Sequence, residues 1–243
     1  MKYLLKSVSL ALLLSISSLL NAQSEAGSVF LLISPGARAG GMGEAQVAVA
    51  NDAYASYWNP AGLAYQEGSE LAFMHVNWLP NLADDMYYEF LGYRKSFPNL
   101  GTIGGHLIYL NLGEQVRMDE YAQYQGKFTS YMMAGAISYS QKINETSSFG
   151  LNAKLSYQHL VELGTGSEKG KGTSIDFGFD VGYMKKGWLL PTLDLGITMT
   201  NIGPKVSFID PDQADPQPTN LTFGFAYELF SSDVNRFSIV YDM

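Results

Sequence analysis

Four long stretches of this chain alternate apolar and polar residues, and this pattern constrains the fold more than any other feature of the sequence. Successive side chains of a strand point to opposite faces, so each stretch predicts a β-strand with one aliphatic or aromatic face. The other face carries glycine, hydroxyl, amide and charged residues. The four stretches are SSFGLNAKLSYQH (147–159), TSIDFGFDVGY (173–183), LDLGITMTN (193–201) and NLTFGFAYEL (220–229).

Alternation alone fits two all-β folds, a secreted sandwich with its apolar face inward or a transmembrane barrel with that face outward. Strand length favours the barrel, because the clear strands run over about 10–13 residues, against about 5–6 in soluble proteins. From residue 69 onward the sequence predicts about nine strands, the first three of which alternate poorly. They are expected at 69–78, 86–95, 102–112, 128–142, 147–160, 173–185, 192–202, 219–229 and 237–243.

The connections between these strands alternate in length, as long outer loops and short periplasmic turns do in a barrel. Greek-key crossings in a sandwich give no such alternation. We therefore predict an all-β, transmembrane antiparallel β-barrel, with Trp78, Tyr87, Tyr88 and Trp188 as candidates for interfacial aromatic girdles. The long connections are expected at 79–85, 113–127, 161–172 and 203–218, and the short ones at 96–101, 143–146, 186–191 and 230–236.

The first 22 residues predict a secretory signal peptide. Lys2 and Lys6 precede an apolar core at 8–20, and Asn21-Ala22 offers small residues for cleavage. Loss of this segment removes two lysines, so the formal charge of −8 becomes −8 − 2 = −10. An acidic chain argues against nucleic-acid partners. The absence of cysteine excludes a disulfide framework, a thiolate site and a cysteine-linked lipid anchor.

The segment SVFLLISPGARAGGMGEAQVAVANDAYASYWNPAGLA (28–64) has the outline of a strand, a glycine loop and a helix. That outline suggests a phosphate-binding loop, but no Lys-Ser/Thr pair is present and strands follow in place of a βαβ unit. The loop at 164–174 fails the same test, because Lys171 precedes Gly172. The glycines of the first segment are instead expected to allow tight turns and close backbone approach in a crowded lumen. They are Gly36, Gly40, Gly41 and Gly43.

Two further features of the same segment favour a packed plug. The alanines between Ala45 and Ala55 supply small side chains for a narrow space. Asn59-Pro60 is expected to end any helix, because the residue before a proline avoids the helical region.

No catalytic or metal-binding arrangement stands out along the chain. His75, His106 and His159 lie far apart, without a second ligand at metal-binding spacing, and no G-x-S-x-G elbow is present. We expect no cofactor and no enzymatic activity. Several carboxylates fit a lumen lining better than a pair of catalytic acids, namely Asp176, Asp180, Asp194 and Glu228.

The acidic, proline-rich segment 201–220 is the candidate partner-docking loop. Its carboxylates could hold a hard cation, but its prolines favour a stiffened loop, and a stiff exposed loop can serve as a docking surface. The candidate docking residues are Asp210, Pro211, Asp212, Asp215 and Pro216.

The segment GARAGGMGEAQVAVANDAYASYWNPAGLA (36–64) resembles the N-terminal signature of the PorV/PorQ group of outer-membrane proteins. These are relatives of the FadL long-chain fatty-acid channels, which carry a similar Asn-Pro-Ala segment. The stretches at 28–43 and 199–227 look closer to PorV than to FadL. The residues that carry the hatch motif are Gly36, Arg38, Gly40, Gly41, Gly43, Asn59, Pro60 and Ala61.

The resemblance implies a barrel of about fourteen strands with an N-terminal hatch or plug folded inside. It also implies a role in the type IX secretion system of Bacteroidota-like bacteria. There such a protein binds cargo by the C-terminal signal domain at the translocon and passes it to a surface attachment complex. The implied partners are outer-membrane lipid, translocon and attachment-complex proteins, and cargo, with no nucleic acid. The alternative is a FadL-like channel for fatty acids or other hydrophobic small molecules, gated by the hatch.

These expectations divide the chain into a signal peptide at 1–22, a hatch at 23–68 and a partial barrel at 69–243. The sequence ends within the alternating stretch NRFSIVYDM, after an odd number of strands. Because closed bacterial barrels have even strand numbers, we expect about five further strands to complete this one.

Overall fold

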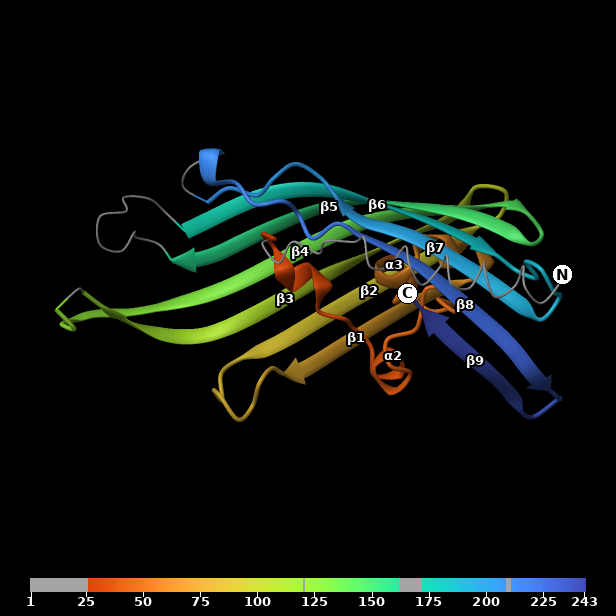
Figure 1. Ribbon diagram of the computed structural model, residues 1–243, viewed down its shortest axis with the longest axis horizontal. Coiled ribbons are helices and arrows are strands. Elements are labelled where there is room, and N and C mark those ends of the chain that lie inside the picture. Colours follow the sequence, from red (N-terminus) through yellow and green to blue (C-terminus); the bar gives the residue numbers. More distant parts are fainter. Residues whose placement is uncertain (1–25, 120, 162–171, 209–210) are drawn as a thin grey trace, which may run out of the picture.

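One antiparallel sheet of nine strands makes up most of the protein (Figure 1). The computed structural model describes residues 26–119, 121–161, 172–208 and 211–243, so the predicted signal peptide lies outside the described residues. The strands are β1 (Ser69–Asn77), β2 (Tyr87–Phe97), β3 (Gly101–Met118), β4 (Tyr124–Asn144), β5 (Ser147–Val161), β6 (Gly172–Lys185), β7 (Leu193–Ile202), β8 (Asn220–Ser231) and β9 (Arg236–Asp242).

The sheet is a simple meander in which each strand pairs with its neighbours in sequence. All nine predicted strands are confirmed, the first three included. The strand order runs from β1 at one edge to β9 at the other, and these two edges do not pair with each other. The nine described strands therefore form an open sheet, in agreement with the expectation of a partial barrel that does not close by itself.

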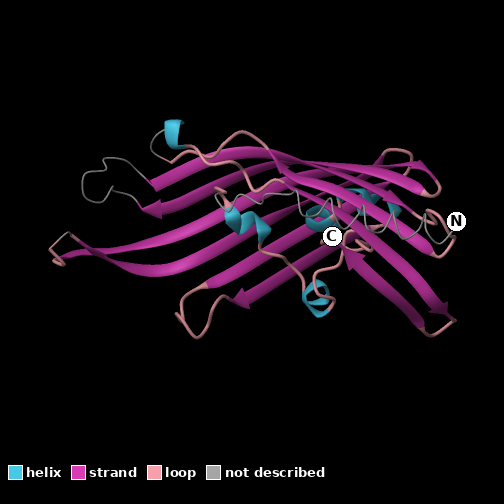
Figure 2. Ribbon diagram, in the orientation of Figure 1, coloured by secondary structure: helices cyan, strands magenta, loops and turns pink. Residues whose placement is uncertain are grey.

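Residues 26–68, which we call the hatch, lie against one face of the sheet, which we call the inner face (Figure 2). The apolar run at the start of the hatch forms a 3₁₀ turn and not a strand. The alanines from Ala45 to Ala55 are buried, as expected for a packed plug. None of the helices in the described residues is both long and apolar enough to cross a membrane. The hatch helices are η2 (Val29–Leu32), α2 (Ala37–Gly41), α3 (Ala55–Trp58) and η3 (Pro60–Tyr65).

The central strands bury their polar face and expose their apolar face. In β5, Asn152 and Ser156 point inward and are buried, whereas Leu151 and Leu155 on the outer face are 41% and 58% exposed. β6 repeats the pattern, with Asp180 buried on the inner face and exposed aromatic residues on the outer face. A soluble sandwich buries its apolar face, whereas the strands of transmembrane barrels expose theirs, as β5 and β6 do.

The first strands alternate poorly in sequence because their inner face is apolar as well. Inward side chains of β2, β3 and β4 pack with hatch side chains in one buried cluster, which we call the apolar cluster. The apolar cluster therefore buries Phe30 and Leu31 of the hatch against the strands whose apolar and polar residues alternate least. The cluster consists of Phe30, Leu31, Tyr88, Phe90, Ile108, Leu110 and Ala134.

A row of tyrosines crosses the outer face over four adjacent strands, near the end that carries the longer connections. The ring centroids of Tyr87 and Tyr109 are 5.9 Å apart, and those of Tyr109 and Tyr131 are 6.0 Å apart. Tyr157 continues the row at 6.0 Å from Tyr131. We call these four residues the tyrosine row, and such rows are typical of the interface between lipid and water.

Three predictions for this end of the sheet were wrong. Trp78 is not a girdle residue, because it packs against the apolar cluster on the inner face. Tyr88 is not a girdle residue, because it points inward and its hydroxyl donates to the carbonyl of Ile33 in the hatch over 3.1 Å. The connection expected at 113–127 is mostly strand, since β3 continues to Met118 and β4 begins at Tyr124. A register shift after Asn111 lets the pairing resume beyond the expected end.

Candidate functional site

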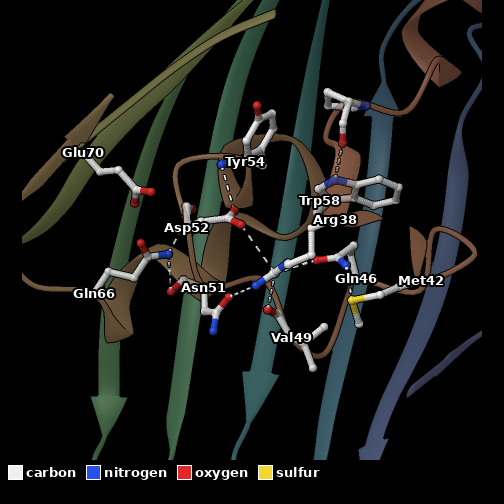
Figure 3. Close-up of polar contacts among 12 residues, drawn as sticks. Arg38, Met42, Gln46, Val49, Asn51, Asp52, Tyr54, Trp58, Gln66 and Glu70 are labelled. Atoms are coloured by element: carbon white, nitrogen blue, oxygen red, sulfur yellow. Dashed lines mark hydrogen bonds and ion pairs between the residues drawn. The ribbon is translucent and has the colours of Figure 1, made fainter. Parts of the chain in front are cut away.

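Arg38 on α2 ties the hatch together (Figure 3). Its Nη1 donates to Asn51 Oδ1 over 2.6 Å, and its Nη2 donates to Gln46 Oε1 over 2.7 Å and to the Val49 carbonyl over 3.1 Å. Nη2 also lies 3.5 Å from Asp52 Oδ2. One guanidinium thereby holds the segment that follows α2 against the helix, because its five donors form a rigid fork.

Asp52 links this cluster to α3. Its Oδ1 accepts a hydrogen bond from the backbone N–H of Tyr54 over 3.0 Å, and its carbonyl accepts one from Gln66 Nε2 over 3.1 Å. Burial raises the pKa of the Asp52 carboxyl above its ordinary range, although the charge of Arg38 and the Tyr54 N–H oppose the shift. The site therefore disfavours the carboxylate form of Asp52.

The four predicted hatch glycines are of two kinds. Gly36 and Gly43 have φ angles of 104° and 62°, so the backbone turns there in a conformation that favours glycine. Gly40 and Gly41 lie in α2, and a Cβ atom at either would meet nothing within 4 Å. The close approach expected at these two positions is not found.

Asn59 connects the hatch to the sheet. Its buried Nδ2 donates to the carbonyl of Val47 over 2.8 Å and to that of Tyr183 on β6 over 3.3 Å. Its Oδ1 accepts from the N–H of Ala61 over 3.1 Å, which caps η3. Pro60 opens this helix, where its missing N–H costs nothing. As predicted, α3 ends at Trp58 and Asn59 is extended, with φ −159°.

Wall side chains hold the hatch backbone at two further points. The carbonyl of Ala61 accepts from Ser140 Oγ of β4 over 3.3 Å and from Ser148 Oγ of β5 over 2.8 Å. Asp242 of β9 accepts from the N–H groups of Gln46 and Val47 over 2.8 and 2.9 Å. Asn59, Pro60 and Ala61 therefore lie together against the wall.

The close approaches lie opposite glycines of the sheet. A Cβ atom at any of five wall glycines would come within 3.0 Å of a hatch atom. Four of the five form pairs across neighbouring strands, Gly150 with Gly182 and Gly196 with Gly224. These pairs leave flat patches where the hatch backbone rests on the wall. The five are Gly92, Gly150, Gly182, Gly196 and Gly224.

Strands β5, β6 and β7 carry a buried charged network. Lys154 Nζ lies 3.0 Å from Asp180 Oδ1 and donates to Asn201 Oδ1 over 2.7 Å. Asp180 Oδ2 accepts from Asn152 Nδ2 over 2.8 Å, and the same amide donates to the Ser56 carbonyl of α3 over 2.7 Å. The pair of charges is therefore compensated and connected to the hatch, as buried charges must be.

Ser56 also contacts a buried histidine, without forming a catalytic pair. Its Oγ donates to the carbonyl of Ala53 over 3.0 Å and lies 3.1 Å from His106 Nδ1. Because that carbonyl takes the hydroxyl proton, Nδ1 donates to Oγ and is not placed to act as a base on Ser56. The part of the chain that the structure describes holds no group of three His, Cys, Asp or Glu residues close enough to bind a metal ion.

The candidate docking residues fall on the connection between β7 and β8. Asp210 lies outside the described residues, and Pro211 and Asp212 begin η4 (Pro211–Gln213). Asp215 and Val206 exchange backbone hydrogen bonds of 2.7 and 2.9 Å. Asp212 and Asp215 are exposed residues at the end of the sheet that bears the longer connections.

The base of this connection is tied to the hatch and to β6. The carbonyl of Pro216 accepts from the N–H of Gly27 over 2.9 Å. Gln217 Nε2 donates to the Phe177 carbonyl over 2.9 Å, and Asn201 Nδ2 donates to the Pro218 carbonyl over 3.1 Å. The exposed carboxylates thus lie on a connection whose base is anchored.

The family model for the type IX secretion system protein PorV matches residues 21–243. The chain belongs to the PorV family. A comparison with individual characterised proteins gave no match. Membership gives this PorV-family chain a role in type IX secretion and implies interaction with other components of that system. The family is one of secretion components and is not known for enzymatic activity.

The sequence of this PorV-family protein indicates a packed segment before the strands, but not the part of the wall that contacts it. The wall glycines had a signal, since Gly150, Gly182, Gly196 and Gly224 occupy polar-face positions of alternating strands. A glycine there leaves an inward position without a side chain. Which of these positions meets the hatch depends on pairing register, which the alternation does not give.

Proposed function

We propose that this PorV-family chain is an outer-membrane β-barrel component of the type IX secretion system. In this role it binds cargo by the C-terminal signal domain and shuttles it from the translocon to the surface attachment complex. The location in a membrane is supported by the reversed burial of β5 and β6. Their charged and amide residues point inward, and their aliphatic and aromatic residues point outward. Family membership and the tyrosine row support the secretory role and the outer-membrane location.

The way in which the hatch is held favours docking of cargo at the surface and argues against passage of cargo through the barrel. It is fixed to the wall through Asn59, the Ala61 carbonyl and the Ser56 carbonyl, which accepts a hydrogen bond from Asn152 of the charged network. A segment held by buried contacts on both sides does not move aside easily for a folded cargo domain. Cargo would then contact the connections between strands at the end of the sheet that carries the tyrosine row. One of these connections, 203–219, carries the exposed residues Asp212 and Asp215.

Capture of a cargo signal domain by the full chain tests this proposal. Asp212→Asn combined with Asp215→Asn should weaken capture severalfold, because each exposed charge contributes up to about 1 kcal/mol. Glu145→Gln combined with Asp233→Asn makes the same charge change in turns at the opposite end of the sheet, and it should leave capture unchanged. Equal loss in both double variants, or no capture by the unaltered chain, would contradict the docking role.

One observation favours the channel alternative. A cavity of about 440 Å³ lies between the hatch and the inner face. Leu31, Tyr57 and Trp58 line it from the hatch, and Lys154 and Asn201 line it from the wall. This mixed lining suits an amphipathic molecule better than a bare hydrocarbon. Saturable binding of a fatty acid, lost in Thr222→Trp of the cavity lining on β8, together with absent cargo capture, would favour the channel.

A further inference from the structure

The outer face of the sheet contains an apolar notch on strands β3, β4 and β5. Its volume is about 340 Å³, and its outward-pointing lining is hydrocarbon and aromatic. Gly135 on β4 forms the floor, because it points outward and has no side chain. Register places Gly135 beside Leu107 on one neighbouring strand and Leu155 on the other, and both of these side chains are more than half exposed.

The notch belongs to the middle of the sheet. Each of its three strands is paired on both sides, so its shape does not depend on the open edges at β1 and β9. It is also separate from the cavity beside the hatch, which lies on the inner face. Its lining therefore comes from complete strand pairs of the wall.

Two rings of the tyrosine row border the notch at one end. Tyr109 and Tyr157 line it, and their registers place both beside Met133. Tyrosine hydroxyls at a girdle lie at the level of lipid headgroups, with the hydrocarbon region on the apolar side of the row. The notch lies on the apolar side, where Leu107, Met133 and Leu155 extend the exposed apolar face.

We propose that this notch binds one acyl chain of a membrane lipid, with the lipid headgroup at the tyrosine row. The proposal rests on the outer-membrane location proposed above. An acyl chain matches the lining because the outward groups are apolar and the notch is continuous with the face that contacts hydrocarbon. A void on such a face loses dispersion contacts along its whole lining unless a chain fills it. The notch therefore orders one lipid in preference to its neighbours.

The test uses the full chain in vesicles of phosphatidylethanolamine and phosphatidylglycerol that contain a phospholipid with a diazirine on its acyl chain. After irradiation, peptide mass spectrometry maps the crosslinks over the outer face. We expect an excess of roughly threefold on Leu107, Met133 and Leu155 over Ile175 and Phe177, because a few additional heavy-atom contacts suffice for such a preference.

Gly135→Leu fills the notch and should lower this excess to the level of β6. A Cβ at position 135 would lie 3.1 Å from Leu107 Cδ2, the end of an exposed and flexible side chain, so the strand can accept it. Ala153→Leu is the matched control, since it enlarges an outward residue that does not line the notch. Heat-modifiable gel mobility checks folding, and Gly135→Ala serves as a milder variant should Gly135→Leu not fold.

The outcomes separate the two proposals. Uniform labelling of the outer face, or an excess that survives Gly135→Leu, would overturn the acyl-chain site and leave the membrane location standing. Absence of labelling on every outward residue would overturn both. Crosslinks from the notch to a co-purified protein in place of lipid would show that a protein partner occupies it, and they would also overturn the proposal.

Discussion

The inner face holds the hatch in two different ways on its two sides. On β2, β3 and β4 it presents Tyr88, Phe90 and Ile108, which pack against Phe30 and Leu31. On β5, β6 and β7 it presents a lysine, carboxylates and amides, which bond to hatch and wall through fixed partners. The same plug thus contacts an apolar wall on one side and a charged wall on the other.

The difference separates two tasks. Apolar burial is non-directional and roughly proportional to area, so it holds the hatch firmly without choosing one exact position. Hydrogen bonds depend on distance and angle, so the amides of Asn59 and Asn152 fix the position of the hatch relative to the sheet. Substitutions on the two sides should therefore differ in size, in sensitivity to pairing and in dependence on pH.

The largest effect is expected from breaking the charged network. Asp180→Ala leaves the Lys154 ammonium buried without its partner, which should lower the free energy of unfolding by about 3–5 kcal/mol. Urea unfolding followed by Trp58 fluorescence, in a Trp78→Phe, Trp188→Phe background, measures it. The double variant Lys154→Met, Asp180→Leu should recover most of the loss, because it removes both charges. Equal loss in the single and double variants would show that packing, and not charge, matters there.

Truncation on the apolar side should cost somewhat less. Leu31→Ala opens a cavity in the apolar cluster and should lower the free energy of unfolding by about 2–4 kcal/mol. The neighbouring Leu32 is 48% exposed, so Leu32→Ala is the control and should change the same measurement little. A similar loss in both variants would mean that the cluster does not hold the hatch.

Removal of the positioning amide should have an intermediate effect. Asn59→Ala leaves the Val47 carbonyl and the Ala61 N–H without their partner, at a cost of about 1–3 kcal/mol. Protease cleavage within the hatch should also become faster, because local opening becomes easier. Asn220→Ala, which removes an exposed amide that donates to Thr222 Oγ1, is the control. Unchanged protection in Asn59→Ala would remove this residue from the positioning contacts.

The smallest effect is expected from the pH dependence of Asp52. Burial raises its pKa in the folded protein above the ordinary 3.8, so the folded state binds the proton more tightly than the unfolded state. The free energy of unfolding should therefore fall as the pH rises from about 3.8 through the raised pKa, and level off above it. Asp52→Asn should reduce this slope and make the hatch slightly more stable at neutral pH. An unchanged slope in Asp52→Asn would assign the titration to another group.

The strands with a polar inner face were easier to predict in detail than those with an apolar inner face. Alternation located all nine strands, because the contrast between the two faces is strong from β5 onward and turn residues separate the earlier strands. The inward direction of Tyr88 was not predictable, because residues on both faces of this strand are apolar and the sequence does not show which face is which. The extension of β3 and β4 was missed because their polar outer ends look like a loop.

For the candidate site, the residue types of the hatch predicted its local structure, but the sequence did not predict which strands its residues contact. Asn59-Pro60 and the alanines correctly indicated a helix end and a packed interior. The partners of Asn59 on β6 and of Ser56 on β5 depend on contacts between residues more than 95 positions apart, which no local pattern encodes. Arg38 entered only as part of a family motif, and its bonds to three hatch carbonyl oxygens became visible only in the fold.

The bonds from Asp242 to Gln46 and Val47 have a consequence for the order of folding. They join residues 196 and 195 positions apart, so the hatch is fixed on that side only after β9 has been placed. The entropic cost of closing so long a loop makes contacts of this kind late events. The hatch precedes every strand of the described sheet in sequence, yet it is fixed on this side only after the ninth strand has paired. Until that point the backbone N–H groups of Gln46 and Val47 lack these partners, and this side of the hatch remains accessible to proteases.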